Sequence, residues 1–359
     1  MRNNCKIYHP KFLYIFFLFL SLNIFFFSTA KAESNSFEIT NIDITRPFEI
    51  NFNKNEVIDE GFKKAYDLLL SSIVNSTDRI KINQIGLNEI KGMIESFTIK
   101  EEKFIDEVYY VNLGVSFNKK KVFYYLEKKN IFPSVPEKKS FLFIPIIIDE
   151  NKKDLLIFYN NKIFKEWNTQ PNKTQLINYI LPTEDLEDLN LLKSKFDFIE
   201  QYDFKEITNK YDLNDSIIAL IFKNDKEVRI LSRITLDGNI SLKNQSFSKI
   251  NFNNNDDIDV IINELKIIYE DYWKTYNQIN TSIKLTLNIK ANNKYNDKIS
   301  NFEKTLKNTD LIYEFLISKF DKDFTYYKII FNGTPNTFLK KMSDMKHSFD
   351  TQNKIWILK

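Results

Sequence analysis

The sequence predicts an α+β protein of three small domains with mostly antiparallel sheets. Hydrophobic residues form 43% of the 359-residue chain, and 33 Phe with 18 Tyr can fill several cores. Alternating apolar stretches, typical of strands, are interleaved with stretches of helical period. Pro133 and Pro136 prevent a helix from continuing and indicate a linker. We therefore expect a leader at 1–32 and domains at 33–135, 136–280 and 281–359.

The N-terminal residues have the pattern of a secretory signal. Basic residues precede the apolar run 12–27, and the small residues Ala30 and Ala32 follow it. Cleavage there would release a periplasmic protein beginning at Glu33. The alternative is an uncleaved membrane anchor, although the run is shorter than the ~20 residues that a bilayer needs. No later stretch is apolar enough to suggest a second span.

Charge and composition exclude several classes of function. Four basic residues lie in the leader, so the remaining chain is close to neutral and no nucleic-acid partner is expected. The only cysteine, Cys5, lies in the leader, and the chain has two His, so neither a disulfide scaffold nor a zinc site is expected. The chain has only six Gly and no glycine-rich phosphate loop, so no cofactor is expected.

In the first domain, strands and helices are both predicted from apolar spacing. The strands are residues 37–44, 96–104 and 108–117, and the helices are 56–74, 83–94 and 119–129. Alternation is clearest from Tyr109 to Phe117, which predicts a half-buried strand. In the first helix, Phe62, Tyr66 and Leu69 are expected on the buried face.

The second domain is predicted to contain a strand that is covered on both faces. Residues 141–148 are continuously apolar, although Pro145 within them favours an edge or a bulge. Further strands are expected at 155–159, 178–181, 216–222, 228–235 and 240–242. Helices are expected at 184–192, 204–211 and 258–276, and residues 163–168 fit either a strand or a short helix.

The third domain follows the order β-α-β-β-α-β, which is that of ferredoxin-like folds. Its strands are predicted at 283–289, 311–316, 326–331 and 355–358, and its helices at 297–306 and 333–345. Pro335 suits the first turn of the second helix. We expect the last strand to pair beside an earlier one, so its loss would open a sheet edge.

An acidic segment is the most conspicuous cluster of charge. Glu184, Asp185, Glu187 and Asp188 offer the oxygens that a hard cation prefers. They equally suit the start of a helix, with Thr183 as N-cap and the acids facing the positive end of the dipole. The helix start is the favoured interpretation, with Leu186 and Leu189 facing the core, so no metal-binding residue is assigned.

Two other groups could suggest chemistry. Asp212, Asn214 and Asp215 resemble part of a calcium loop but lack its central Gly and terminal Glu, which favours a polar turn. His347 is the only His beyond the leader, and its place after a predicted helix favours interaction with the helix C-terminus over catalysis. No catalytic residue is assigned.

Lys119, Lys120 and Lys121, near Tyr124 and Tyr125, could suggest a nucleic-acid patch. A secretory signal is at odds with such a partner. A solvated helix start is the favoured interpretation of these lysines.

Several motifs resemble those of a proteobacterial envelope family catalogued as domain of unknown function 2066. They are Gly61–Leu69, the Tyr-rich strand Tyr109–Phe117, Leu181–Asp188, Tyr211–Ile221, and Phe331-Asn-Gly333 followed by Trp356-Ile-Leu358. The resemblance implies an envelope location and small α/β modules. It implies no activity, because the family has none established.

The leading hypothesis is a non-enzymatic periplasmic protein that binds or scaffolds other envelope proteins. One alternative is a hydrolase of an envelope polymer that uses the carboxylates at 184–188. Another is a module that binds a peptide or small molecule. An enzyme needs a pocket with perturbed carboxylates, whereas a scaffold needs an exposed apolar patch or a free strand edge.

Overall fold

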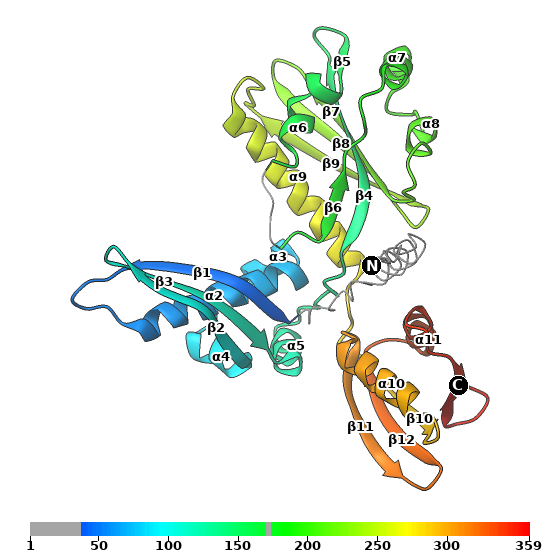
Figure 1. Ribbon diagram of the computed structural model, residues 1–359. Helices are drawn as coiled ribbons and strands as arrows, with labels where there is room; N and C mark the ends of the chain where they lie inside the picture. The colour runs from blue at the N-terminus through cyan, green and yellow to red at the C-terminus, as the bar shows by residue number, and fades with distance from the viewer. Residues whose placement is uncertain (1–36, 83, 170–173) are drawn as a thin grey trace, which may run out of the picture. The chain divides into compact units, whose positions relative to one another are not determined.

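The protein has an α+β fold with three mostly antiparallel sheets. The computed structural model describes residues 37–82, 84–169 and 174–359, and Figure 1 shows the course of the chain. The strands of the first sheet lie within residues 38–117, those of the second within 139–248 and those of the third within 285–358. No helix in the described part of the chain combines the length and apolarity of a membrane span.

The first sheet has the order β1-β3-β2, and both pairings are antiparallel. Its strands are β1 (Glu38–Pro47), β2 (Ile94–Ile105) and β3 (Val108–Phe117). Its helices are α2 (Lys54–Ile73), α3 (Ser76–Ile80), α4 (Leu87–Met93) and α5 (Lys119–Lys128). The predicted helix 83–94 is shorter than expected, since α4 begins only after Gly86, whose backbone N–H is capped by Glu89. The separate short helix α3 was not predicted.

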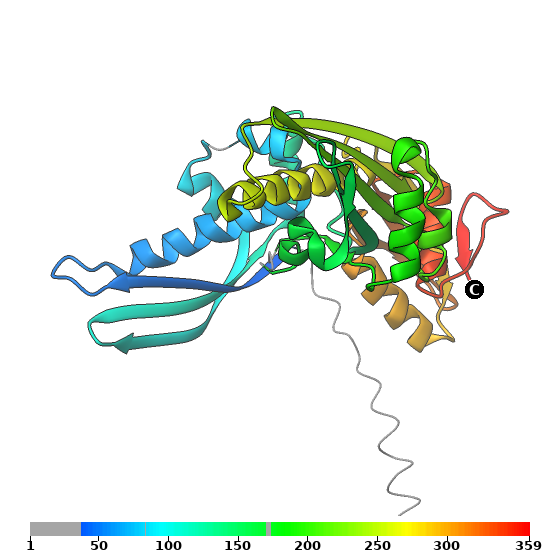
Figure 2. The ribbon, with the colours of Figure 1, turned by 90° about the horizontal axis from the view of Figure 1, so that it is seen from above.

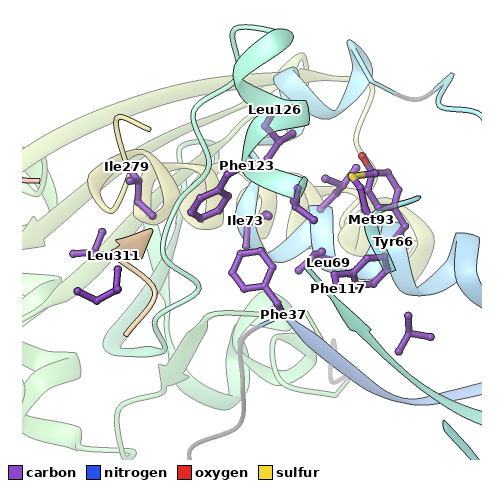
Figure 3. Close-up of a cluster of buried hydrophobic side chains, with 14 of the residues drawn as sticks. Phe37, Tyr66, Leu69, Ile73, Met93, Phe117, Phe123, Leu126, Ile279 and Leu311 are labelled. Carbon is purple, nitrogen blue, oxygen red and sulfur yellow. The ribbon is translucent and has the colours of Figure 1, made fainter. Parts of the chain in front are cut away.

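Alternation in β3 determines which face of this sheet is buried. Tyr109, Val111, Leu113, Val115 and Phe117 are all buried, as predicted, and α2 covers them with Phe62, Tyr66 and Leu69. The same apolar cluster extends through Phe123 of α5 to Ile279 and Leu311 (Figure 3). The first and third sheets are therefore joined by a shared hydrophobic core.

The second sheet has the order β5-β4-β7-β8-β9, with β6 also paired to β4. Its strands are β4 (Lys139–Asp149), β5 (Asp154–Leu156), β6 (Ile177–Ile180), β7 (Ser216–Lys223), β8 (Glu227–Leu236) and β9 (Asn239–Ser248). Helix α6 (Lys162–Glu166) and helix α9 (Asn255–Tyr276) cover one face, while α7 (Leu186–Ser194) and α8 (Lys205–Thr208) cover the other. Figure 2 shows the yellow α9 and the green α7 and α8 on opposite sides. Residues 141–149 are all buried, which confirms the prediction from their apolar run.

Pro145 lies in a gap between two short partner strands. On one side of β4, β6 pairs with residues 139–142 and β5 with residues 147–149. The N–H of Leu142 points towards β7, so by alternation the nitrogen of Pro145 points into this gap, where no ladder bond is lost. The buried Asn161 fills the gap and donates from Nδ2 to the Pro145 carbonyl at 2.9 Å. The proline therefore marks a local edge on a strand that is otherwise central.

The third sheet has the order β11-β12-β10-β14-β13. Its elements are β10 (Leu285–Asn292), α10 (Asn296–Asn308), β11 (Ile312–Phe320), β12 (Phe324–Phe331), α11 (Pro335–Asp344), β13 (Phe349–Asp350) and β14 (Trp356–Leu358). The predicted last strand does pair beside an earlier one, because β14 lies next to β10. One addition was not predicted. The chain first forms β13 and then turns back, so β14 lies between β13 and β10 and runs parallel to β10.

Candidate functional site

A cavity of about 640 Å³ lies between α9 and the turn that joins α2 to α3. This volume is within the range of small-ligand sites. The α2–α3 wall includes Leu68, Ser71 and Arg79. The α9 wall includes Asp259, Ile262, Asn263, Lys266, Ile267, Glu270, Asp271 and Lys274. The polar stripe of an amphipathic helix thus lines a pocket.

Two carboxylates in this pocket are occupied by donors of the fold. Asp271 accepts hydrogen bonds from the backbone N–H and the hydroxyl of Ser76, at the start of α3. Glu270 accepts from the backbone N–H groups of Leu176 and Ile177 at 3.1 and 2.9 Å. Burial raises the pKa of Glu270, and these two amides oppose the rise. Both acids fasten α9 to neighbouring segments, which leaves fewer of their acceptor sites for other donors.

Two cations at the same end of the pocket keep unused donors. Lys274 is buried, yet its ammonium has only long contacts, 3.4 Å to the Val74 carbonyl and 3.9 Å to Asp271. Arg79 donates from Nη1 to the hydroxyl of Ser71 at 2.6 Å and has no carboxylate within 4.0 Å among the described residues. Burial lowers the pKa of Lys274, the charges of Asp271 and Glu270 oppose this decrease, and the positive charge of Arg79 adds a smaller contribution to it. This end of the pocket is therefore rich in donors.

The other part of the pocket presents free acceptors. Glu166 and Asp259 line it, and within the described residues no donor hydrogen-bonds to either carboxylate. Lys266 lies between the two ends, with its Nζ 5.5 Å from the centre of the Trp167 ring. Burial lowers the pKa of Lys266, while the charges of Asp259 and Glu270 oppose the decrease. The pocket therefore has hydrogen-bond donors at one end, from Arg79 and Lys274, and acceptors at the other, from Glu166 and Asp259.

A second candidate site is an exposed apolar tip, formed by Phe48, Ile50, Phe104 and Ile105. All four side chains are more than half exposed. The loop after β1 and the turn between β2 and β3 meet there (Figure 1), and the Phe48 N–H donates to the Glu107 carbonyl at 2.7 Å. The rings of Phe48 and Phe104 are 4.6 Å apart in edge-to-face contact. The apolar tip is thus a defined surface built from two connected loops.

The rim of the apolar tip is acidic. Nearby cations are paired within the fold, as in Arg46 with Glu60 and Lys54 with Glu102, both at 2.6 Å. Glu49, Asp106 and Glu107 are exposed, and no cation among the described residues forms an ion pair with them. The unbalanced charge around the tip is therefore negative.

The acidic segment forms a helix start, although not with the predicted cap. Asp185, rather than Thr183, is the N-cap of α7 and accepts from the Glu187 N–H at 2.8 Å. Lys210 lies 2.7 Å from both Asp185 and Asp188, and its ammonium lowers the pKa of Asp185. Glu184 and Glu187 are exposed. A lysine thus occupies the place between the two inward acids.

The predicted orientation of the helix at 186–194 also needs correction. Leu186 is 75% exposed, so it does not face the core, whereas Leu189 is partly buried and Leu192 is buried. The cap at Asp185 shifts the helix by two residues relative to a start at Thr183. Leu186 is thus the first residue of α7, and its side chain lies in solvent. Across the described residues, no group of three or more His, Cys, Asp or Glu is placed to hold a metal ion.

The two other predicted groups have structural contacts. Asp215 is buried, forms an ion pair with Lys139 at 2.6 Å and accepts from the Asp237 N–H at 2.8 Å. His347 follows α11 and hydrogen-bonds with Thr305 at 2.9 Å. Burial lowers the pKa of His347, so the predicted cationic interaction with the helix end is not favoured.

The three lysines begin α5, as predicted, and Lys121 is exposed, but the prediction that they are solvated fails for Lys119. Lys119 donates to the carbonyls of Thr309 and Asp310, both at 3.1 Å, and burial lowers its pKa. Lys120 forms an ion pair with Glu314 at 2.6 Å, and Lys121 donates to the Gly92 carbonyl at 2.8 Å. These side chains fasten α5 to other elements. The exposed Tyr124 is contacted by Lys128, whose Nζ lies 4.5 Å from the ring centre.

The pocket was not predicted from the sequence, and the reason is physical. Residues Asp259, Lys266, Glu270 and Lys274 read as the polar face of an amphipathic helix, which is normally solvated. The available signal was the pairing of Glu270 with Lys274 at i, i+4, which is common on exposed helices. Only the fold shows that this face lies against the α2–α3 turn.

The expected signal at 1–32, with its site at Ala30 and Ala32, lies outside the described residues. No protein-family model matches the chain, and no curated protein matches it.

Proposed function

We propose that this is a non-enzymatic periplasmic protein that binds other envelope proteins through its apolar tip. The observation that carries the proposal is the exposure of Phe48, Ile50, Phe104 and Ile105 on one connected surface. Large apolar side chains gathered in one exposed place are typical of interaction sites.

The tip is organised before any partner binds. Phe48 is held by its hydrogen bond to the Glu107 carbonyl and by ring contacts with Phe52 and Phe104, at 5.0 and 4.6 Å. Asp106 and Glu107 both have positive φ, at 48° and 60°, as in a tight two-residue hairpin turn. A surface that is already ordered loses less conformational entropy on association, so the affinity for a partner can be higher than the small area of the tip suggests.

The charge around the tip favours one class of partner. Glu49, Asp106 and Glu107 would be attracted by Lys or Arg at the rim of an apolar recess in a protein. Anionic lipid would be repelled by the same acids. The tip of a second copy would also be repelled, because it carries the same charges. A protein with a basic rim is therefore the favoured partner.

The remaining features support a binding role in the envelope. The predicted leader and the resemblance to an envelope family both favour export. Acid–base chemistry at 184–188 is disfavoured by the pairing of Lys210 with Asp185 and Asp188. In the pocket, Glu270 and Asp271 are occupied by backbone and hydroxyl donors. Neither of these two pairs, Asp185 with Asp188 or Glu270 with Asp271, is free for hydrolysis.

The test places a photo-crosslinking residue at position 50 in cells that express the protein. We expect a discrete protein adduct. It should be absent when the photo-crosslinking residue is placed instead at the exposed Tyr295, in the third domain. Charge reversal by Glu49→Lys with Asp106→Lys should reduce the adduct about tenfold, which corresponds to about 1.4 kcal/mol. Unfolding midpoints of the variants serve as the control for folding.

Three outcomes would contradict the proposal. They are equal adducts at positions 50 and 295, adducts with lipid alone, and an adduct that is unchanged by charge reversal. An adduct of twice the protein's mass would instead indicate a second copy as the partner.

A further inference from the structure

We propose that the pocket beside α9 binds a short peptide, with its terminal carboxylate at Arg79 and Lys274 and its ammonium end towards Glu166 and Asp259. This inference concerns a different surface from the apolar tip and does not depend on it. It rests on which hydrogen-bonding groups the fold has left unused on the pocket wall.

The carboxylate end follows from the supply of donors. A guanidinium carries five N–H donors and an ammonium three. Of these, Arg79 uses one on Ser71, and Lys274 makes only the two long contacts with Val74 and Asp271. The nearby acids form no short contact with these donors, because Asp271 is held by Ser76 and Glu270 by the amides of Leu176 and Ile177. An incoming carboxylate would provide the missing acceptors.

The proximity of two cations supports the same assignment. Arg79 lies close enough to Lys274 for its charge to disfavour the ammonium, in addition to the effect of burial. Asp271 and Glu270 compensate part of this repulsion at Lys274, and a further anion between the two cations would reduce it more. A guanidinium also binds a carboxylate through two parallel hydrogen bonds, which gives the site directional specificity. Asp67 is the other acid near Arg79, and burial raises its pKa, which weakens its competition.

The ammonium end follows from free acceptors in the rest of the pocket. Neither the Glu166 nor the Asp259 carboxylate receives a hydrogen bond from the described residues, although the Glu166 backbone carbonyl accepts from Thr169. From Asp259 to Lys274 along α9 is about 22 Å at 1.5 Å per residue. The long side chains of Arg79 and Lys274 at one end can reduce the separation between the charges, and an extended peptide of four residues spans up to about 14 Å. Leu68, Ile262 and Ile267 provide apolar contacts between the two ends.

Acids in the pocket distinguish a peptide from a phosphate compound. A phosphate group would bring about two negative charges close to Glu270 and Asp271. A peptide carboxylate brings one, and the ammonium at the other end balances it. Among the described residues, the pocket lining has four carboxylates and three cations, which favours a ligand that carries both signs of charge.

The experiment measures binding of Ala-Leu-Leu-Ala with free termini to the full protein by titration calorimetry. We expect saturable binding that weakens at least tenfold when the peptide is C-terminally amidated, and several-fold when it is N-acetylated. Arg79→Gln should weaken binding of the peptide with free termini at least tenfold. Lys81→Gln is the matched control, because Lys81 lies two residues further along, outside the pocket, and is paired with Asp78.

The modified peptides keep the test decisive even if Arg79→Gln does not fold, because they use the unaltered protein. Equal affinity for the free and amidated peptides would overturn the assignment of the carboxylate end. Absence of binding by the free peptide at millimolar concentration would overturn the proposal as a whole. If inorganic phosphate binds more tightly than the peptide, the proposal of a peptide ligand is wrong and the pocket binds a phosphate compound.

Discussion

The acidic segment before α7 and the α9 wall of the pocket differ in how well their charged side chains are paired. The segment 184–188 has four carboxylates in a short stretch of sequence, yet the two inward ones share Lys210 and one of them caps a helix. The α9 wall has ordinary helical spacing, yet it contains a buried ammonium with poor contacts. A site is therefore indicated less by the density of charge in the sequence than by the donors and acceptors that remain unused after folding.

The largest effect should come from removing Asp271. Asp271→Ala leaves Lys274 buried without its nearest carboxylate and removes two acceptors from Ser76. We expect the free energy of unfolding to fall by about 3 kcal/mol, in line with buried charges that lose a partner. Urea unfolding at neutral pH measures it. If adding Lys274→Met to this variant restores no stability, the interpretation of Lys274 as a strained buried charge is wrong.

Removing Asp188 should have a smaller effect, although this side chain is more deeply buried than that of Asp271. In Asp188→Ala, Lys210 keeps Asp185, and the loss is further reduced because Asp188 Oδ2 has no partner in the described part of the chain. We expect a loss of about 1–2 kcal/mol. A loss equal to that of Asp271→Ala would remove the contrast between the two regions.

The pH dependence of stability should have opposite signs in the two regions. Burial raises the pKa of Glu270 above its ordinary value of 4.5, so its stabilisation relative to Glu270→Gln is greatest below pH 4.5 and declines as pH rises through the folded pKa. Lys210 lowers the pKa of Asp185 below 3.8. Its stabilisation relative to Asp185→Asn is therefore present above pH 3.8 and is lost as pH falls through the folded pKa.

Urea unfolding of the wild type and both variants, from about pH 2.5 to about pH 7, tests these opposite slopes. Each variant is compared with the wild type at the same pH, which cancels titration elsewhere. Slopes of the same sign would mean that one of the two environments is misassigned.

Glu184→Ala should have the smallest effect. Glu184 is exposed and precedes the cap of α7, so we expect a change within about 0.5 kcal/mol. Calcium should not raise the melting temperature of either protein, because Lys210 already neutralises the inward acids. A calcium-dependent increase in the wild type that is lost in Glu184→Ala would restore the cation site.

Periodic patterns predicted most elements of the fold, because burial on one face leaves a direct record in the sequence. The alternation of β3 and the apolar face of α2 are two such records. The gap at Pro145 could not be predicted, since it depends on where β5 and β6 end beside β4. For the same reason, the pocket could not be read from α9 alone. Its character depends on Ser76, Leu176 and Ile177, which are distant in the sequence and occupy the acids.

The position of β14 has a consequence for the order in which the chain can fold. Residues 285–292 of β10 pair with β12 on one side, whereas on the other side Ile289 and Lys290 pair with the later Trp356 and Ile357. During vectorial synthesis or export, β10 must therefore wait with an open edge until this later segment has emerged. Pairings between distant segments form slowly, and a waiting edge can pair with another chain. This open edge is thus a place where a chaperone could protect the chain during its maturation.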